Sequence, residues 1–221
     1  MFDLDPQAAA TNHLATDTST EYDWDKTIRQ VLLSEISLDD TLIHPWPNLS
    51  FCPSQLRLQN IEKDLADETN PIFVIHDLID TIRKDYDFCI IDTAPNTGLL
   101  TRAALAASHQ VVIPCLTEKW PIESLEISME AIEKIASAQK YLATKIENVR
   151  ILPTFFEERR QLTEAFYYAM KQGYSKYLSG TVIHRSVDIG KTYGQALGRL
   201  DHSMRAKEEY MHLVDEILGG Q

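Results

Sequence analysis

The stretch from Phe88 to Cys115 constrains the fold more than any other part of the sequence. It contains an apolar run that ends at Asp92, a cluster of turn-forming residues, an Ala- and Leu-rich segment at 99–107, and a second apolar run at 110–115. Continuous apolar runs separated by a helix-forming segment are typical of parallel strands that are covered on both faces. This stretch therefore predicts a βαβ unit and an α/β fold.

The alternation of strands and helices continues on both sides of this unit. Helices are predicted at 27–33, 38–43, 55–66, 72–84, 99–107, 122–136, 161–171 and 210–218, and strands at 49–52, 88–91, 110–115, 149–155 and 181–184. The sequence shows neither an internal repeat nor a long linker. It therefore predicts one domain over residues 1–221, a doubly wound and mostly parallel sheet flanked by helices.

The chain is acidic, because 33 Asp and Glu residues against 21 Lys and Arg residues give a formal net charge of −12. Long-range electrostatics then oppose binding to nucleic acids and anionic membranes, so contact with phosphate would need a local basic patch. Basic residues do concentrate in the last third of the chain, although isolated surface charges are the commoner explanation. No apolar run approaches the roughly 18 residues that cross a bilayer, which predicts a cytoplasmic protein with no membrane partner.

Several other chemistries are disfavoured by the sequence. Three cysteines, Cys52, Cys89 and Cys115, are far apart and lie beside apolar residues, which indicates buried reduced thiols and not a disulfide framework or zinc site. The seven histidines form no His-Glu-x-x-His pattern, and there is no Gly-x-Ser-x-Gly segment. Zinc-dependent and serine-hydrolase functions are therefore not expected.

Two acidic motifs lie where α/β proteins build nucleotide sites, at the carboxyl ends of strands. The first is Asp3-Leu4-Asp5-Pro6-Gln7, and the second is Ile90-Ile91-Asp92-Thr93-Ala94-Pro95. An aspartate that ends an apolar strand can hold Mg²⁺ through water, and a second carboxylate nearby can orient or deprotonate an attacking water. For either motif alone, a structural role explains the sequence equally well, because an aspartate at the end of a strand often caps the following helix or turn.

Together and in this order, the two motifs resemble the ParA/Soj partition ATPases, which are relatives of MinD. The resemblance begins with 3–11 and 90–95 and continues through 99–105, Ile113-Pro114, Glu123-Ser124-Leu125, 154–162 and 181–187, so it covers nearly the whole chain. It implies a P-loop ATPase that dimerises around ATP and Mg²⁺ and binds DNA nonspecifically as the dimer. It also implies a ParB-like centromere-binding protein as the partner that stimulates hydrolysis.

The resemblance implies roles for five residues. Asp5 matches the catalytic carboxylate associated with water activation, and Asp3 matches the acidic residue just before it. Asp92 matches the Walker B position that holds Mg²⁺ through water, so Asp3 and Asp92 are the expected cofactor-binding residues. Arg185 and Arg205 match basic positions near the DNA surface, which implies DNA binding and, within the cytoplasm, association with the nucleoid.

The chain departs from the family at its start, where the family has a strand and a Lys-Gly-Gly-x-Gly-Lys-Thr loop before the motif that begins here at Asp3. That loop supplies the backbone amides and lysines that hold the phosphates. Gly190-Lys191-Thr192 imitates the end of such a loop, but the position five before Gly190 is Arg185. We therefore expect a sheet truncated at the P-loop strand, impaired ATP binding, and association of the open strand edges with a second copy or another ParA-like chain.

Three hypotheses follow. The first is a ParA-like partition protein, which by resemblance is an ATP-dependent, dimerising, DNA-binding ATPase. The second is a non-enzymatic descendant that uses the family surface to bind a protein partner. The third, which the sequence favours least, is an unrelated α/β enzyme that uses Asp3, Asp5 and Asp92 for metal chemistry.

Overall fold

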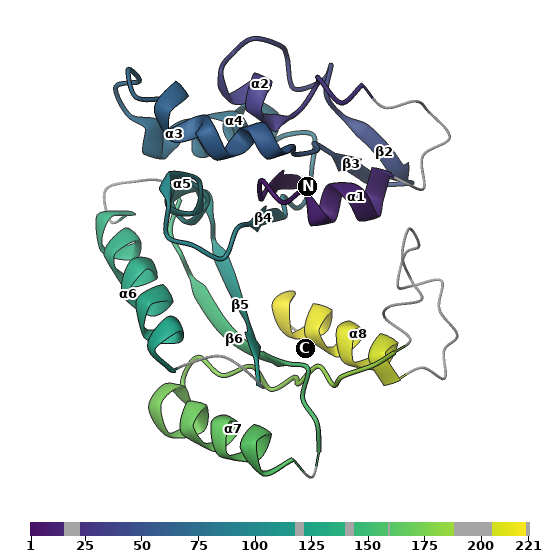
Figure 1. The fold of residues 1–221 in the computed structure, drawn as a ribbon, viewed down its shortest axis with the longest axis vertical. Helices are drawn as coiled ribbons and strands as arrows, with labels where there is room; N and C mark the ends of the chain where they lie inside the picture. The colour runs from purple at the N-terminus through teal and green to yellow at the C-terminus, as the bar shows by residue number, and fades with distance from the viewer. Residues whose placement is uncertain (16–22, 118–121, 140–143, 159, 188–204, 220–221) are drawn as a thin grey trace. The chain divides into compact units, whose positions relative to one another are not determined.

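The computed structural model describes residues 1–15, 23–117, 122–139, 144–158, 160–187 and 205–219 (Figure 1). The chain forms two compact units. Unit 1 comprises residues 1–108 and 133–145, and unit 2 comprises residues 109–132 and 146–221. The single domain expected over 1–221 stays a prediction.

Unit 1 is organised around the short strand β1 (Phe2–Leu4), which is buried along its whole length. On one side β1 pairs in parallel with β4 (Ile91–Thr93), and on the other side it exchanges backbone hydrogen bonds with Cys52. Cys52 follows an antiparallel hairpin of β2 (Ile43–Trp46) and β3 (Leu49–Phe51). The amino-terminal motif is therefore held between two neighbouring segments and not at an edge.

Short helices complete unit 1. They are α1 (Ala9–Ala15), α2 (Ile28–Leu32), η1 (Leu56–Asn60), α3 (Ile61–Asp64), η2 (Pro71–Phe73), α4 (Val74–Ile82) and α5 (Leu99–Ala107). The apolar faces of the helices after α1 and those of β1 and β4 form one core, which includes Phe2, Leu4, Ile28, Leu58, Ile75, Leu100, Ala103 and Ala104. Burial of this apolar surface is the main force that fixes β1 and β4 in place.

Unit 2 contains the second parallel pair, β5 (Gln110–Leu116) and β6 (Asn148–Thr154), which stay in register over their full lengths. The chain passes between them through α6 (Ile122–Ala138), and then continues into α7 (Gln161–Tyr174) and α8 (Arg205–Ile217). A small cluster of Leu152, Ile183 and Leu213 packs α8 against β6 and the segment beside it. Parallel strands joined through helices confirm the α/β prediction.

Several predicted elements differ from the structure. The strand expected at 88–91 is shifted, because β4 covers Ile91–Thr93 and Asp92 lies within it. The segment 38–43 was expected to be helical, but it leads into the β2–β3 hairpin. Pro45 and Pro47 cannot donate helical hydrogen bonds, and Asn48 takes the positive φ of 64° that the turn requires. The segment 181–184 runs beside β6 but makes only a single bridge, His184 with Phe156, and is not a strand.

The boundaries of α5 and the burial of Cys52 and Cys115 agree with the sequence-based expectations, whereas Cys89 is only partly buried. All three cysteines are free thiols. Burial raises the pKa of Cys52 and of Cys115 to about 12, so both remain protonated thiols at neutral pH. In the described part of the chain, no helix has the length and apolar character required to cross a membrane.

Candidate functional site

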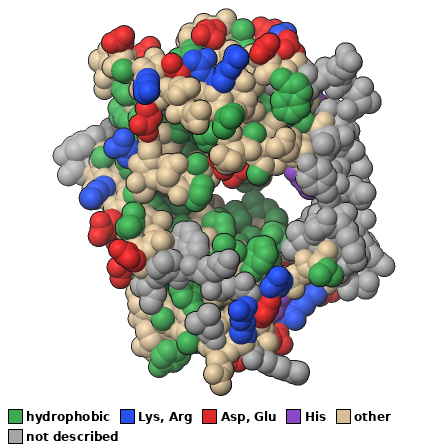
Figure 2. Space-filling view, in the orientation of Figure 1, with side chains coloured by type: hydrophobic (Ala, Val, Ile, Leu, Met, Phe, Trp, Pro, Cys, Tyr) green, Lys and Arg blue, Asp and Glu red, His purple; other side chains and the backbone are tan. Residues whose placement is uncertain are grey.

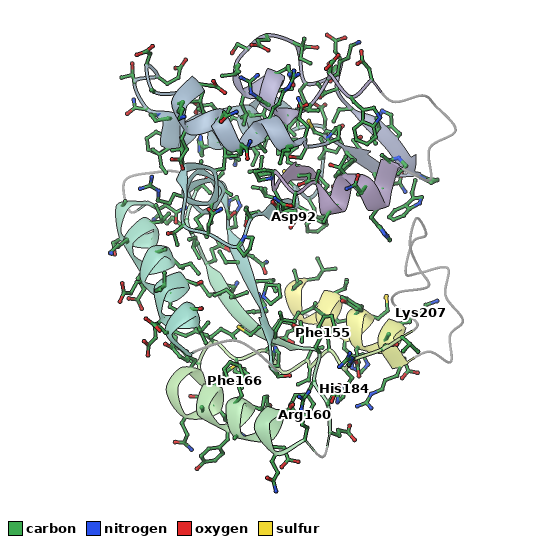
Figure 3. The ribbon with its side chains drawn as sticks, viewed as in Figure 1. Asp92, Phe155, Arg160, Phe166, His184 and Lys207 are labelled. Atoms are coloured by element: carbon green, nitrogen blue, oxygen red, sulfur yellow. The ribbon has the colours of Figure 1, made fainter. Side chains whose placement is uncertain are left out.

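The two acidic motifs meet at one edge of the parallel pair in unit 1. The register of β1 with β4 places Asp3 opposite Asp92, and Asp5 follows directly after β1. Asp3 and Asp92 are the middle residues of these two short parallel strands, and Asp5 is the first residue after β1, so the two acidic motifs lie side by side. Figure 3 labels Asp92 at this position on β4.

The Asp3 carboxylate is fully buried and is satisfied by donors from within unit 1. One oxygen accepts from the backbone N–H of Asp5 at 3.0 Å. The other accepts from the backbone N–H of Thr11 at 2.9 Å and from its hydroxyl at 2.7 Å. Hydrogen bonds of this kind stabilise the charged form of a buried carboxylate.

Asp5 lies at the start of a tight turn that leads into α1. Its Oδ1 accepts from the backbone N–H of Gln7 at 2.9 Å, and its carbonyl oxygen accepts from Ala8 N–H at 2.9 Å. Ala8 has a φ of 53°, a left-handed conformation that costs a residue with a Cβ about 1 kcal/mol or more. The surrounding contacts therefore hold the turn at Asp5 in a conformation that it would not favour alone.

Asp92 is half-buried, and its pKa is raised to about 6. Burial is the main cause, and the negative charges of Asp3 and Asp5 add to it. A carboxylate in this environment gains free energy when a cation reduces the repulsion. The electrostatics of unit 1 thus favour a positively charged ligand beside Asp92.

The donor set fits magnesium bound through water. Within the residues that the structure describes, no three Asp, Glu, His or Cys side chains are grouped to hold a metal directly. Mg²⁺ keeps much of its hydration shell and is commonly held by one or two carboxylates, so Asp92 suits it as a ligand through water.

The N-terminus of α5 follows the Asp92 loop and already has an anionic partner. The backbone N–H of Leu99 donates to Glu62 Oε1 at 2.6 Å. A Cβ added to Gly98 would lie 2.9 Å from that same oxygen, so this glycine permits the close approach of the carboxylate. The other candidate for phosphate binding, Gly190-Lys191-Thr192, lies outside the described residues.

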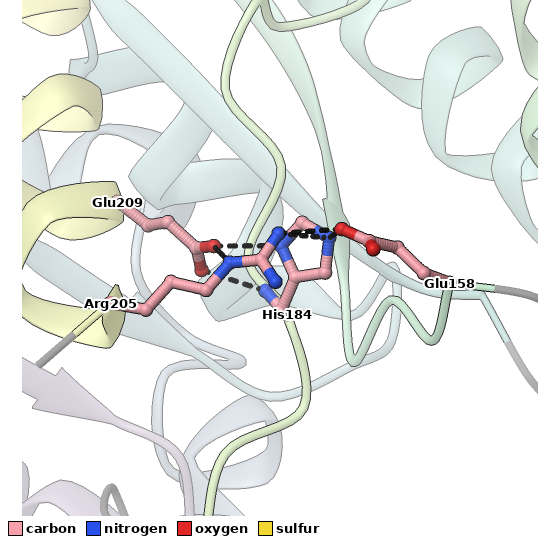
Figure 4. Close-up of polar contacts among 4 residues, drawn as sticks. All are labelled: Glu158, His184, Arg205 and Glu209. Carbon is pink, nitrogen blue, oxygen red and sulfur yellow. Dashed lines mark hydrogen bonds and ion pairs between the residues drawn. The ribbon is translucent and has the colours of Figure 1, made fainter.

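A second cluster of ionisable groups lies in unit 2, where Arg205 of α8 meets His184 (Figure 4). Arg205 donates to Glu158 at 2.8 Å and to Glu209 at 2.7 Å. Its Nη2 lies 2.8 Å from His184 Nε2, while His184 Nδ1 lies 2.7 Å from Glu209. His184 Nε2 also lies 3.2 Å from Glu158, so each ring nitrogen of His184 faces a carboxylate. The hydrogen bond to Glu158 is the largest cause of the raised pKa of Arg205, whose guanidinium stays charged.

Arg185, the other expected DNA-binding residue, donates to Glu157 at 2.8 Å. Figure 2 shows acidic and basic side chains intermixed over the region of unit 2 that carries α8. Both predicted arginines are more than half exposed, and both have glutamate partners. Sequence reasoning missed those partners, although Glu209 lies four residues after Arg205, the spacing at which helical ion pairs form.

Comparisons with known proteins show the family to which the chain belongs. A family model described as an AAA domain matches residues 1–147. The sporulation initiation inhibitor protein Soj of Bacillus subtilis is 26% identical over 220 residues, which cover 98% of this chain and 85% of that protein.

Two solved structures share the fold. One is a putative plasmid partition protein from Borrelia burgdorferi bound to AMPPNP, with a TM-score of 0.77 at 23% identity, covering 100% of this chain and 85% of that one. The other is cobyrinic acid a,c-diamide synthase from Mycobacterium smegmatis with a bound ATP analog and magnesium, with a TM-score of 0.79 at 22% identity, covering 98% and 80%. The family model and the match to Soj show that the chain belongs to the AAA-domain family of ParA/Soj-type partition ATPases.

Proposed function

We propose that the chain acts in the partition of replicated DNA. In this proposal, Asp5 and Asp92 are the carboxylates of a site that binds a nucleotide and magnesium. The observation that supports this most directly is the parallel register of β1 with β4, which sets Asp3 opposite Asp92 with Asp5 directly after it. The raised pKa of Asp92 adds an electrostatic reason for a cation to bind there.

Each residue has a separate task in this proposal. Asp92 binds the hydration shell of Mg²⁺, and the metal, when bound, neutralises charge on a nucleotide phosphate. Asp5 orients the attacking water and accepts its proton. The hydrogen bond from Gln7 N–H to Asp5 Oδ1 aligns the carboxylate for that task.

We also propose that a polypeptide of these 221 residues binds Mg·ATP weakly. It contains no Lys-Gly-Gly-x-Gly-Lys-Thr segment to neutralise the phosphates. In addition, Glu62 takes up an amide at the N-terminus of α5 that a phosphate could otherwise use.

A second candidate function is a non-enzymatic interaction module. The residues that lead into β4 favour it, because Phe88 is 69% exposed and Ile90 is 60% exposed. Exposed apolar side chains beside a short strand suit pairing with another protein segment. A second copy or another ParA-like chain would bind at these residues. In the partition role, the chain would also bind a ParB-like partner and DNA.

Calorimetric titration of the purified chain with Mg·ATP tests the proposed weakness of nucleotide binding. We expect no binding in the micromolar range. Micromolar binding that Asp92→Asn abolishes and the exposed control Asp87→Asn preserves would contradict the proposed weakness and establish a working nucleotide site. If the chain does not bind Mg·ATP but captures another protein of the same family, the interaction module is favoured.

For DNA, we expect weak binding that is lost at modest salt, because Arg185 and Arg205 are already paired with glutamates. Fluorescence anisotropy with a short duplex over a salt series measures this. Replacing both arginines with Ala should remove the remaining affinity, whereas Arg83→Ala, directly after α4, should not. A tight complex that resists salt would show that the local basic residues outweigh the net charge of −12.

A further inference from the structure

Three buried polar side chains in unit 1 form a closed set of hydrogen bonds around the backbone of Asp5. The Asp5 N–H donates to Asp3 Oδ1 at 3.0 Å. Asp3 Oδ2 accepts from the Thr11 hydroxyl at 2.7 Å, and that hydroxyl accepts from Ser54 N–H at 2.8 Å. The Ser54 hydroxyl then donates to the Asp5 carbonyl at 2.8 Å, which closes the ring.

The members of this ring come from three separate parts of the chain. Asp3 belongs to β1, Thr11 to α1, and Ser54 follows the hairpin, more than 40 positions away in sequence from the other two. All three are 0% exposed. Burying polar groups costs free energy unless they are hydrogen-bonded, so three at one place call for an explanation.

The hydrogen bonds of the ring hold both backbone polar groups of Asp5. They fix the peptide N–H and the carbonyl oxygen of Asp5, while Gln7 N–H fixes its Oδ1. Among the described residues, no hydrogen bond engages Asp5 Oδ2. The arrangement thus holds one carboxylate in a set direction and leaves one of its oxygens available to a ligand.

We propose that Asp3, Thr11 and Ser54 form a positioning ring, in which Ser54 and Thr11 act through the Asp5 backbone to aim the Asp5 carboxylate. This inference rests on the proposed function, in which Asp5 orients a water molecule. A group with that task must be held to within a fraction of an ångström, and buried hydrogen bonds from outside the turn provide such support. It also assigns Asp3 a role in holding Asp5, without requiring Asp3 to touch the nucleotide.

The strained turn supports the same conclusion. Ala8 keeps its φ of 53° while its N–H donates to the Asp5 carbonyl that Ser54 also binds. A turn with such a conformation persists only where the surroundings enforce it. Removing the Ser54 hydroxyl should therefore loosen residues 5–8 before it affects the rest of unit 1.

The test is NMR spectroscopy of the full chain carrying Ser54→Ala, with no nucleotide present. We expect a changed ¹³C resonance of the Asp5 carboxylate at pH 7.5, and about tenfold faster hydrogen exchange of the Gln7 amide, as the loss of one hydrogen bond would give. Ser54→Cys, which nearly keeps the volume of this buried side chain, should give smaller changes in the same direction.

Two controls separate positioning from simple stabilisation. Ser108→Ala removes an equally short serine-to-carbonyl bond, 2.7 Å to Ala104, elsewhere in unit 1. Thr11→Ser loses a methyl group but keeps the hydroxyl of the ring. Both should lower stability and leave the Asp5 carboxylate resonance unchanged.

Unchanged Asp5 and Gln7 signals in both Ser54 variants would overturn the proposal, as would equal changes in the two controls. Since the readout needs no ATP, such a failure would leave the proposed nucleotide chemistry standing. Conversely, failure to bind Mg·ATP would not affect the result at Asp5. The two proposals are therefore tested separately.

Discussion

The carboxylates of unit 1 and the ionisable cluster of unit 2 are held in opposite ways. In unit 1, Asp3 is buried and is satisfied by hydroxyl and backbone donors that carry no charge. In unit 2, Arg205 is 58% exposed and is held by the charges of Glu158 and Glu209. The first arrangement fixes negative charge without cancelling it, whereas the second cancels charge at the surface.

This difference has consequences for function and for stability. Burial, and after it the negative charges of Asp3 and Asp5, raise the pKa of Asp92, which favours a cation beside it. Paired charges at the surface leave less net field to attract DNA. Buried neutral donors resist salt, while exposed ion pairs are screened by it. Each prediction below tests one side of this contrast.

The largest effect is expected from Thr11→Val in unit 1. Valine has the shape of threonine but lacks the hydroxyl, so the Asp3 carboxylate loses a donor and Ser54 N–H loses its acceptor. Ser54 N–H is then buried without an acceptor, and Asp3 Oδ2 keeps only the Thr11 N–H, so the change should cost about 3 kcal/mol. Urea denaturation at low and at high salt measures it, and the loss should be the same in both.

The matched control for that variant is Thr81→Val, whose hydroxyl donates to the Leu78 carbonyl at an exposed position on α4. It should cost about 0.5 kcal/mol or less, since water replaces the lost bond. The contrast between units would be wrong if Thr11→Val cost no more than this control, or if its cost disappeared in salt.

The next effect concerns Glu216 on α8, the most strongly bonded carboxylate in the described part of unit 2. It accepts from the Ser179 and Thr181 hydroxyls and from two backbone amides. Partial burial alone would raise the pKa of Glu216, but the bonds from Ser179, Thr181 and Gly180 outweigh it and hold the pKa below its ordinary value. Glu216→Ala should cost about 2 kcal/mol at pH 7.

The pH dependence of that loss gives a second check. Because the folded protein holds Glu216 with a lowered pKa, its contribution is present above the ordinary glutamate range and is lost as the pH falls. The stability difference between wild type and Glu216→Ala should therefore shrink toward pH 3. Asp215→Ala, at the exposed neighbouring position, should show no such convergence.

Much of this arrangement could be predicted from the sequence because it depends on local patterns. The apolar run before Asp92 and the Ala- and Leu-rich segment after it predicted β4 and α5 as neighbours in an α/β unit. The sequence placed both acidic motifs at the ends of strands, but only the structure shows that these two strands pair and set Asp3 opposite Asp92.

What the sequence could not show depends on contacts between distant residues. Ser54 lies 49 positions from Asp5, and no local pattern marks it as a partner. Asp3 was expected to bind a cofactor, and only its burial reveals how completely the chain itself satisfies its carboxylate. His184 was similarly unremarkable until folding brought it beside Arg205 and Glu209.

Asp92→Asn should change the free energy of unfolding by a smaller amount, and it should stabilise the protein instead of destabilising it. A raised pKa means that the folded protein binds the proton more tightly than the unfolded chain, so stability falls as the pH rises through the interval from about 4 to about 6. Asparagine carries no charge and avoids this loss. After allowing for solvent screening of a half-buried group, the variant should be about 1 kcal/mol more stable at pH 7.

Thermal unfolding at pH 4 and pH 7 measures this gain, which should be nearly absent at pH 4, where wild-type Asp92 is largely protonated. The exposed Asp87→Asn serves as the control and should change little at either pH. A destabilised Asp92→Asn at pH 7 would mean that a cation or an unrecognised donor already compensates the charge in the free protein.

The smallest effect is expected for Arg205 with Glu158, where both side chains are more than half exposed. A double-mutant cycle with Arg205→Gln and Glu158→Gln should give a coupling free energy of about 0.5 kcal/mol or less at low salt. The coupling should vanish in about 0.5 M salt, because the screening length is then only a few ångströms. A coupling above 1 kcal/mol that survives salt would place this pair in the same class as the buried ring of unit 1. The buried ring of unit 1 and the Arg205 cluster of unit 2 would then differ in the sign of their charge, and not in the strength of the interactions that hold them.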